Sequence, residues 1–173
     1  MPPDPPLTGY FGKLPSAAGF LGASLPPDFT DRWDNWYAAA TRTAPPPPIA
    51  YDEPAWRFVA AAGLFGPLAA AGVWRHSHDS RGERYPFVIA ALGRDLAVDD
   101  PWFDAAETLL TQTVDGDITT SDLDRGLSRL PVPLPAAPPS AAVMMWRDDW
   151  EVHELNFPSG RAFAAFGLPQ GGS

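Results

Sequence analysis

The chain has 173 residues, a length that predicts one domain. Its 12 Lys and Arg against 21 Asp and Glu give a formal net charge of −9. A binder of bare nucleic acid or anionic lipid is therefore not expected, because phosphate groups are bound mainly by positive charge. The chain has no cysteine, which excludes disulfides, thiolate zinc sites, iron–sulfur clusters and cysteine nucleophiles. Its 22 Pro and 15 Gly predict short elements joined by many turns.

Neither a leader segment nor a membrane span is predicted. Residues 1–6 are rich in proline and lack the cationic and apolar parts of a secretory signal. Residues 58–74 carry no charged side chain, but they are mostly small and contain Pro67, whereas a membrane helix needs about 20 strongly apolar residues. We therefore expect a soluble, cytoplasmic protein without direct membrane insertion.

The first predicted elements are a strand and an aromatic helix. Residues 8–14 are short, aromatic and closed by Pro15, which predicts a strand. After Pro26, apolar residues recur with helical spacing, which predicts a helix. Its apolar face is formed by Phe29, Trp33, Trp36, Tyr37 and Ala40. The proline-rich residues 44–50 follow as a stiff connector.

The middle of the chain predicts three strands and then two helices. Residues 56–62 and 73–77 predict strands, and the nearly all-apolar residues 85–92 predict a central strand covered on both faces. Asp99-Asp100-Pro101 is typical of a helix start, since proline suits the first helical turn. Residues 119–130 carry leucines at helical spacing and predict a second helix, capped by Thr120 or Ser121.

A second proline-rich connector, residues 130–139, precedes the last predicted elements. Residues 142–146 and 150–157 predict two closing strands, and residues 161–166 predict a short helix. Because strands and helices are not segregated, we predict an α/β fold with a mixed central sheet covered by helices. The connectors 44–50 and 130–139 would then cross the surface of a single domain, residues 1–173.

The segment His76-Ser77-His78-Asp79 is the strongest candidate for chemistry. In a strand, His76 and His78 point to one face, as metal ligands require. However, the chain has only three His, and no nearby carboxylate pattern completes a ligand set. Adjacent Ser, His and Asp residues cannot form a hydrolytic triad, because each partner must approach the next across space. The residues predict no metal site, but a small metal-dependent hydrolase using His76, His78 and Asp79 stays an alternative.

Residues 9–13 (Gly-Tyr-Phe-Gly-Lys) superficially resemble a phosphate-binding loop. The motif requires Ser or Thr after the lysine, where this chain has Leu14, and the bulky Tyr10 and Phe11 would obstruct backbone contacts to a phosphate. We therefore predict no nucleotide and, more generally, no cofactor.

Several motifs together are more specific than any one of them. Gly9–Ser16, followed by Phe20 and by Trp33-Asp34-Asn35-Trp36, resembles the opening of the TagF (ImpM) family, accessory proteins of bacterial type VI secretion systems. Residues 54–58 are similar to the family segment A-P-x-W-R-F. Residues 72–87 are similar to its segment G-V-x-x-P-S-x-D-x-x-G-R-x-F-P. The resemblance covers approximately residues 9–92.

This resemblance implies a three-layer α/β/α sandwich and a regulator that is not an enzyme. TagF-like proteins repress type VI secretion after translation, some of them by acting on a forkhead-associated scaffold protein beside a threonine kinase/phosphatase pair. The implied partner is therefore a protein of the secretion machinery. Where the family carries charged residues this chain has Gly19, Ser80 and Glu83. If those positions contact the partner, the contact surface of this chain has an altered charge.

We expect an exposed ridge formed by the strand end 11–13 and the loop 77–84 to bind the partner. Such binding would rest on a few aromatic or arginine anchors and on electrostatic steering. The candidate contact residues are Phe11, Gly12, Lys13, Arg57, Ser77, Asp79, Gly82 and Arg84. Lys13 and Arg57 stand out, because each is a charge inside an otherwise apolar motif. A structural secretion subunit is a further alternative, and the oligomeric state stays open.

Overall fold

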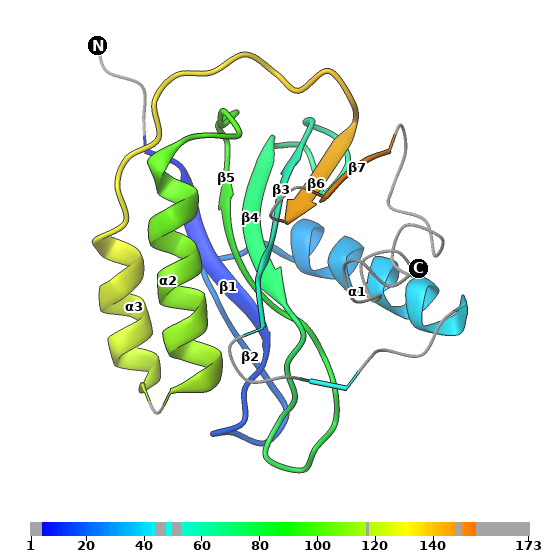
Figure 1. Cartoon of the computed structure of the whole chain (residues 1–173), viewed down its shortest axis with the longest axis vertical. Coiled ribbons are helices and arrows are strands. Elements are labelled where there is room, and N and C mark those ends of the chain that lie inside the picture. The colour runs from blue at the N-terminus through cyan, green and yellow to red at the C-terminus, as the bar shows by residue number, and fades with distance from the viewer. Residues whose placement is uncertain (1–4, 44–47, 50–52, 117, 148–149, 155–173) are drawn as a thin grey trace.

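Seven strands and three helices make up the described part of the computed structural model, which comprises residues 5–43, 48–49, 53–116, 118–147 and 150–154. The strands are β1 (Leu7–Lys13), β2 (Phe20–Ala23), β3 (Trp56–Ala60), β4 (Ala70–Arg75), β5 (Phe87–Leu92), β6 (Val143–Arg147) and β7 (Trp150–Glu154). The helices are α1 (Pro27–Thr43), α2 (Pro101–Asp115) and α3 (Thr120–Ser128). The predicted α/β class is confirmed (Figure 1).

The strands form one sheet in the order β2-β1-β5-β4-β3-β6-β7. The prediction of a mixed sheet is wrong, because each described pair of neighbouring strands is antiparallel. Short connections join β1 to β2, β3 to β4 and β6 to β7, and a two-stranded hairpin is antiparallel by construction. The long connection through α2 and α3 returns the chain to the edge of β3, where β6 also runs antiparallel.

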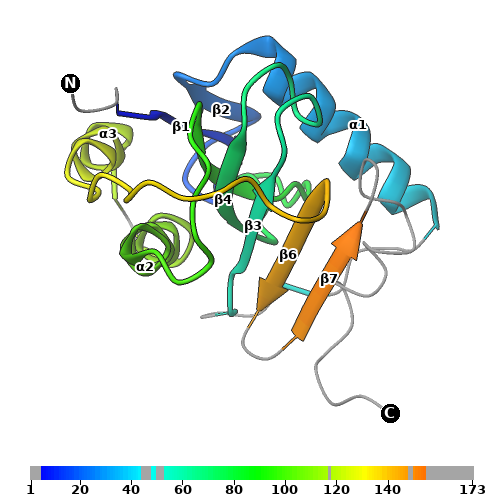
Figure 2. The same ribbon diagram turned by 90° about the horizontal axis from the view of Figure 1, so that it is seen from above.

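The helices pack on opposite faces of the sheet, α1 on one face and α2 with α3 on the other (Figure 2). On the α1 side, Trp33 and Trp36 pack against Trp74 of β4. On the other side, Phe103 and Leu110 of α2 belong to a second buried cluster with sheet residues. All residues of β4 and β5 are buried. The prediction of a covered central strand within residues 85–92 is therefore confirmed, although the strand begins two residues later than predicted, at Phe87.

The helix starts follow ordinary capping chemistry. The carboxylate of Asp100 accepts the N–H of Trp102 at 2.9 Å, and Pro101 opens α2 as predicted. The predicted cap of α3 is wrong by a residue or two, since Thr119 caps the helix in a reciprocal capping box with Asp122.

Strand β2 was not predicted, because four residues without polar alternation give no strand signal. Beyond it, the predicted helix 161–166 and most of connector 44–50 lie outside the described residues. None of the described helices is long and apolar enough to cross a membrane.

Candidate functional site

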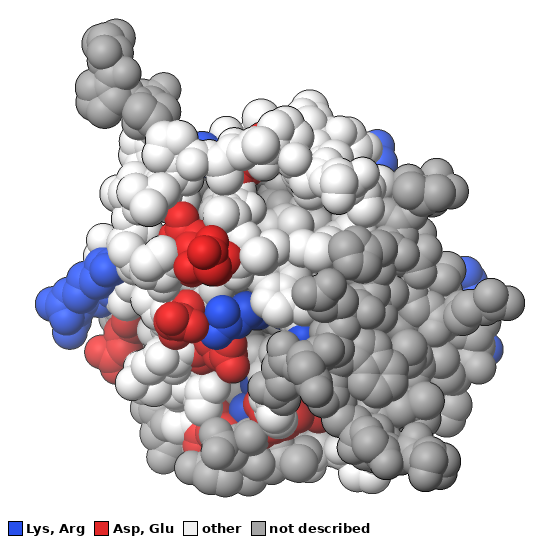
Figure 3. All heavy atoms as spheres, turned by 45° about the horizontal axis from the view of Figure 1, so that its top comes forward, with Lys and Arg blue, Asp and Glu red and all other residues white. Residues whose placement is uncertain are grey.

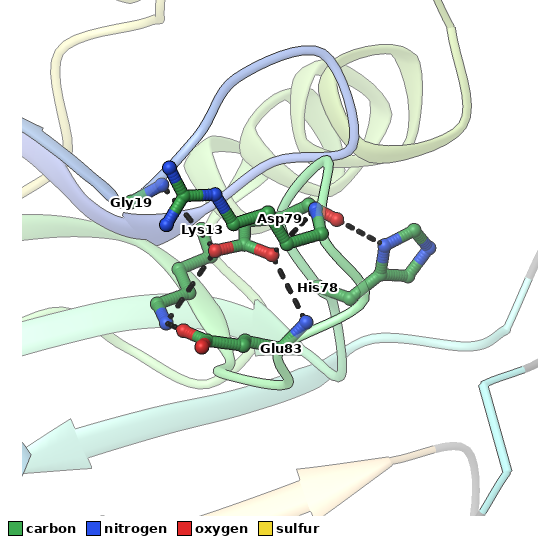
Figure 4. A network of polar contacts seen from close by, with 6 residues as sticks. Lys13, Gly19, His78, Asp79 and Glu83 are labelled. Carbon is green, nitrogen blue, oxygen red and sulfur yellow. Dashed lines mark hydrogen bonds and ion pairs between the residues drawn. The ribbon is translucent and has the colours of Figure 1, made fainter.

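The sheet brings the two segments of the predicted ridge together at one end. Strand β1, which ends at Lys13, is paired with β5, and the β4–β5 loop (residues 76–86) leads into β5. The Nζ atom of Lys13 lies 2.9 Å from the Glu83 carboxylate and 3.6 Å from that of Asp79 (Figure 4). Residues separated by about 70 positions in the sequence thus form one polar cluster, composed of Lys13, Asp79 and Glu83.

Asp79 organises the β4–β5 loop. One of its carboxylate oxygens accepts the backbone N–H groups of Arg81 and Glu83, each at 2.9 Å. The other oxygen accepts the N–H of Gly19 at 3.3 Å, which ties the loop to the turn between β1 and β2 (Figure 4). Burial alone would raise the pKa of Asp79, but these N–H donors and Lys13 outweigh it and lower the pKa below its usual value. Asp79 is therefore an ionised anchor of the loop.

The predicted ridge is only partly exposed, and this corrects the sequence interpretation. Gly12, Lys13, Ser77 and Asp79 are buried, because they form the support of the loop and not its surface. The exposed part is residues 80–84, which include the candidates Gly82 and Arg84. A charge can be buried here because its partners are fixed around it.

Phe20 of β2 is an exposed aromatic residue beside this loop, and it was not among the predicted contact residues. This residue is 53% exposed. The ring stacks on Phe11 with a centroid distance of 5.5 Å, meets the edge of Tyr85 at 4.7 Å, and lies 4.8 Å from the Nζ atom of Lys13. Phe20 belongs to the residues that resemble the family, and this could have marked it as a candidate. Its exposure, however, depends on strand β2, which was not predicted. These contacts hold an exposed ring in a fixed position, as a binding anchor requires.

Gly12 is required by the close approach of β1 to the start of β5. Its φ of +143° is rare for residues with a side chain, and an added Cβ would collide with the carbonyl oxygen of Pro86 and lie 2.8 Å from the Cα of Phe87. We expect Gly12→Ala to destabilise the fold more than Gly82→Ala in thermal unfolding, because Gly82 also has a positive φ, of +82°, but open space around it, so only the Gly12 variant adds a collision. Equal melting temperatures for the two variants would contradict this role of Gly12.

Arg57 lies apart from the polar cluster. It extends from β3 to α2, where its guanidinium contacts Asp104 at 2.8 Å and Glu107 at 2.7 Å. Burial alone would lower the pKa of Arg57, but the two carboxylates outweigh it and raise the pKa. Figure 3 shows acidic and basic side chains gathered on the face that carries α2. The described ion pairs of Arg57 thus join the sheet to a helix, and the β4–β5 loop takes no part in them.

The His76-Ser77-His78-Asp79 segment does not assemble a metal site in the part of the chain that the structure describes. There, no three His, Asp or Glu side chains converge as metal ligands. His78 donates a hydrogen bond from Nδ1 to the backbone carbonyl of Asp79 at 2.8 Å. His76 is buried, and its ring meets the edge of Trp74 at 5.4 Å. These contacts give the hydrolase alternative no support.

The buried His76 predicts a loss of stability in mild acid. Burial first, and then the charges of Arg84, Arg147 and Arg75, lower the pKa of His76 from 6.5 to about 4. Between those two values the unfolded chain binds a proton that the folded chain does not, so stability falls as the pH decreases. The full shift corresponds to about 3 kcal/mol.

Urea unfolding of the wild type and His76→Phe measures this effect, since phenylalanine keeps a ring against Trp74 but cannot titrate. We expect the wild type to lose more stability than the variant between about pH 7 and about pH 4.5, inside the window set by the His76 pKa. Parallel pH dependences of the two proteins would show that His76 is not the group responsible.

The fold and the cluster define a class of protein: an α/β domain with an antiparallel sheet, in which a buried ionised carboxylate holds an exposed loop at one end. A family model described as the TagF N-terminal domain, Type VI secretion system-associated, matches residues 9–130. The chain belongs to this family, which confirms the resemblance predicted from the sequence.

The fold is also that of a solved structure. The crystal structure of PA0076 from Pseudomonas aeruginosa PAO1 superposes with a TM-score of 0.73 at 21% sequence identity, over 96% of this chain and 96% of that one. At this identity the likeness concerns the fold alone. A search of curated proteins found no match.

Proposed function

We propose that this chain is a non-enzymatic accessory protein of a type VI secretion system, and that it represses secretion after translation by binding a component of the machinery. The observation that carries the proposal is the match of the type VI secretion-associated family to residues 9–130. The proposed site of action is the cytoplasm, and the proposed partner is a forkhead-associated scaffold protein. A repressor that acts by binding needs a rigid exposed surface and no catalytic groups.

The proposed contact surface consists of residues 80–84 and the ring of Phe20. It is supported by its construction: the Asp79 carboxylate fixes the backbone of the loop, and Lys13 contacts both the loop and the Phe20 ring. Preformed surfaces bind more tightly because less conformational entropy is lost on association. Of the eight candidate residues, Gly82, Arg84 and the half-buried Phe11 would contact the partner. The buried Gly12, Lys13, Ser77 and Asp79 would support the surface, and Arg57 would stabilise the sheet against α2.

Secretion by a strain that lacks the protein tests the repressor role. Deletion is expected to raise secretion of a type VI substrate, and expression of the wild-type chain is expected to lower it again. If deletion abolishes secretion, the chain is a structural part of the machine and the proposal is wrong.

Binding to the purified scaffold protein tests the surface. We expect Phe20→Ala and Arg81→Ala each to weaken binding by about tenfold, the loss typical of an anchor residue. Leu68→Ala is a matched control, since Leu68 is also an exposed apolar residue but lies between β3 and β4. Unchanged binding by both surface variants would place the contact elsewhere.

A further inference from the structure

The connector between α3 and β6 has a regular pattern of burial. Its residues 131–139, here called the strap, contain five prolines and form neither helix nor strand. Along the strap two exposed residues are followed each time by one that is buried or half-buried. The inward residues are Pro133, Ala136 and Pro139. The strap crosses the end of the molecule as an extended segment (Figures 1 and 2).

A burial period of three is the pattern expected of a polyproline II helix that lies on a surface. That helix has three residues per turn and no internal hydrogen bonds, and proline fixes the backbone angle it needs. One of its three edges faces the protein in the strap. The other two edges face outward, one with Pro131, Leu134 and Ala137 and the other with Val132, Pro135 and Pro138.

The strap is fixed at its centre by a buried carboxylate. One oxygen of Asp100 caps α2, and the other accepts the backbone N–H of Leu134 at 2.9 Å. Because Asp100 is itself buried and held by the helix start, the strap keeps its position without a partner. Much of the entropy that an extended segment loses on binding is therefore already lost.

The backbone of the strap selects the kind of partner. Pro131, Pro133 and Pro135 have no N–H group, and the N–H of Leu134 is already used by Asp100. A partner therefore cannot add to the strap as a β-strand, which requires alternating donors. The strap offers carbonyl acceptors and apolar side chains, and Val132 and Leu134 are 64% and 66% exposed. The surface complementary to such a segment is a groove lined with aromatic side chains that donate hydrogen bonds.

We propose that the strap is a preformed polyproline II ligand for a protein with an aromatic-lined groove. Hollows adjoin both of its ends, one of about 490 Å³ beside Pro131 and one of about 220 Å³ beside Ala137. The strap leads into β6 at Val143, which is paired with Ala60 at the end of the sheet opposite the β4–β5 loop. This second surface is therefore separate from the proposed scaffold-binding surface.

Purified SH3, WW and EVH1 domains are suitable probes, since they bind polyproline II segments through aromatic grooves. Each is titrated by calorimetry against the full chain, against Leu134→Asp and against Leu68→Asp. The control adds the same charge at an exposed leucine outside the strap. We expect at least one domain to bind the wild type with a Kd below about 1 mM. Leu134→Asp should weaken that binding by about tenfold and Leu68→Asp should not change it.

Three results would overturn the proposal: no binding by any of the domains, equal binding by Leu134→Asp, or equal weakening by the control. Circular dichroism and thermal unfolding of both variants establish that they are folded, as expected for substitutions at exposed positions. Binding of Leu134→Asp to the secretion scaffold is expected to be unchanged, so the two proposed surfaces can fail independently.

Discussion

Replacing Trp33 with alanine is expected to lower the free energy of unfolding by about 3–5 kcal/mol. Trp33 is completely buried where α1 meets the sheet. Its ring lies 4.7 Å from that of Trp36, 5.7 Å from Phe58 and 6.0 Å from Trp74, measured between ring centroids. Alanine would leave a cavity that these rigid rings cannot fill, and loss of contacts would add to loss of burial. Urea unfolding measures the change.

A second variant distinguishes the contribution of the Trp33 ring to stability from that of its N–H group. The Nε1 of Trp33 is buried and has no hydrogen-bond acceptor among the described residues. Trp33→Phe keeps an aromatic ring and removes a polar atom that is costly to bury. We therefore expect it to lose clearly less stability than Trp33→Ala. If the two variants were equally destabilised, ring packing would not be the main contribution of this residue.

Helices and strands were predicted well from the sequence where their apolar residues follow one clear pattern. The helical spacing of aromatic residues located α1, and the continuous apolar residues 85–92 located β5, because burial of one or both faces leaves a direct pattern. Strand direction leaves no such pattern. The sheet is antiparallel because of how the connections run, and the composition of a buried strand is the same in either direction.

The candidate site was located by its motifs, but its geometry was not predictable. Lys13 and Asp79 were correctly expected to lie near one another in the fold, yet both were expected on the surface. Each can be buried because the fold supplies it with a partner. The N–H of Gly19, in the turn between β1 and β2, binds Asp79, and the carboxylate of Glu83, in the β4–β5 loop, binds Lys13. Arg57 similarly has its partners on a helix about 50 residues away. Whether a charged side chain is exposed for binding or buried as part of the fold can therefore be decided only when such distant partners are known.

The second large effect is expected at the buried ion pair between Arg75 and Asp115. The side chain of Arg75 at the end of β4 is completely buried, and its guanidinium lies 2.7 Å from the Asp115 carboxylate at the end of α2. A carboxylate at a helix C-terminus is unfavourable by itself, since the helix dipole is negative there. The pairing with Arg75 offsets this repulsion and joins the helix to the sheet.

Asp115→Ala is expected to destabilise the fold by about 3–5 kcal/mol, because Arg75 stays buried without this carboxylate. The double variant Arg75→Met with Asp115→Leu removes both charges and fills similar volume, so it should recover most of that loss. Urea unfolding of Arg75→Met, of Asp115→Leu and of the double variant forms a double-mutant cycle that measures the coupling. Additive effects would mean that the two residues act independently and that this ion pair does not hold the end of α2 to β4.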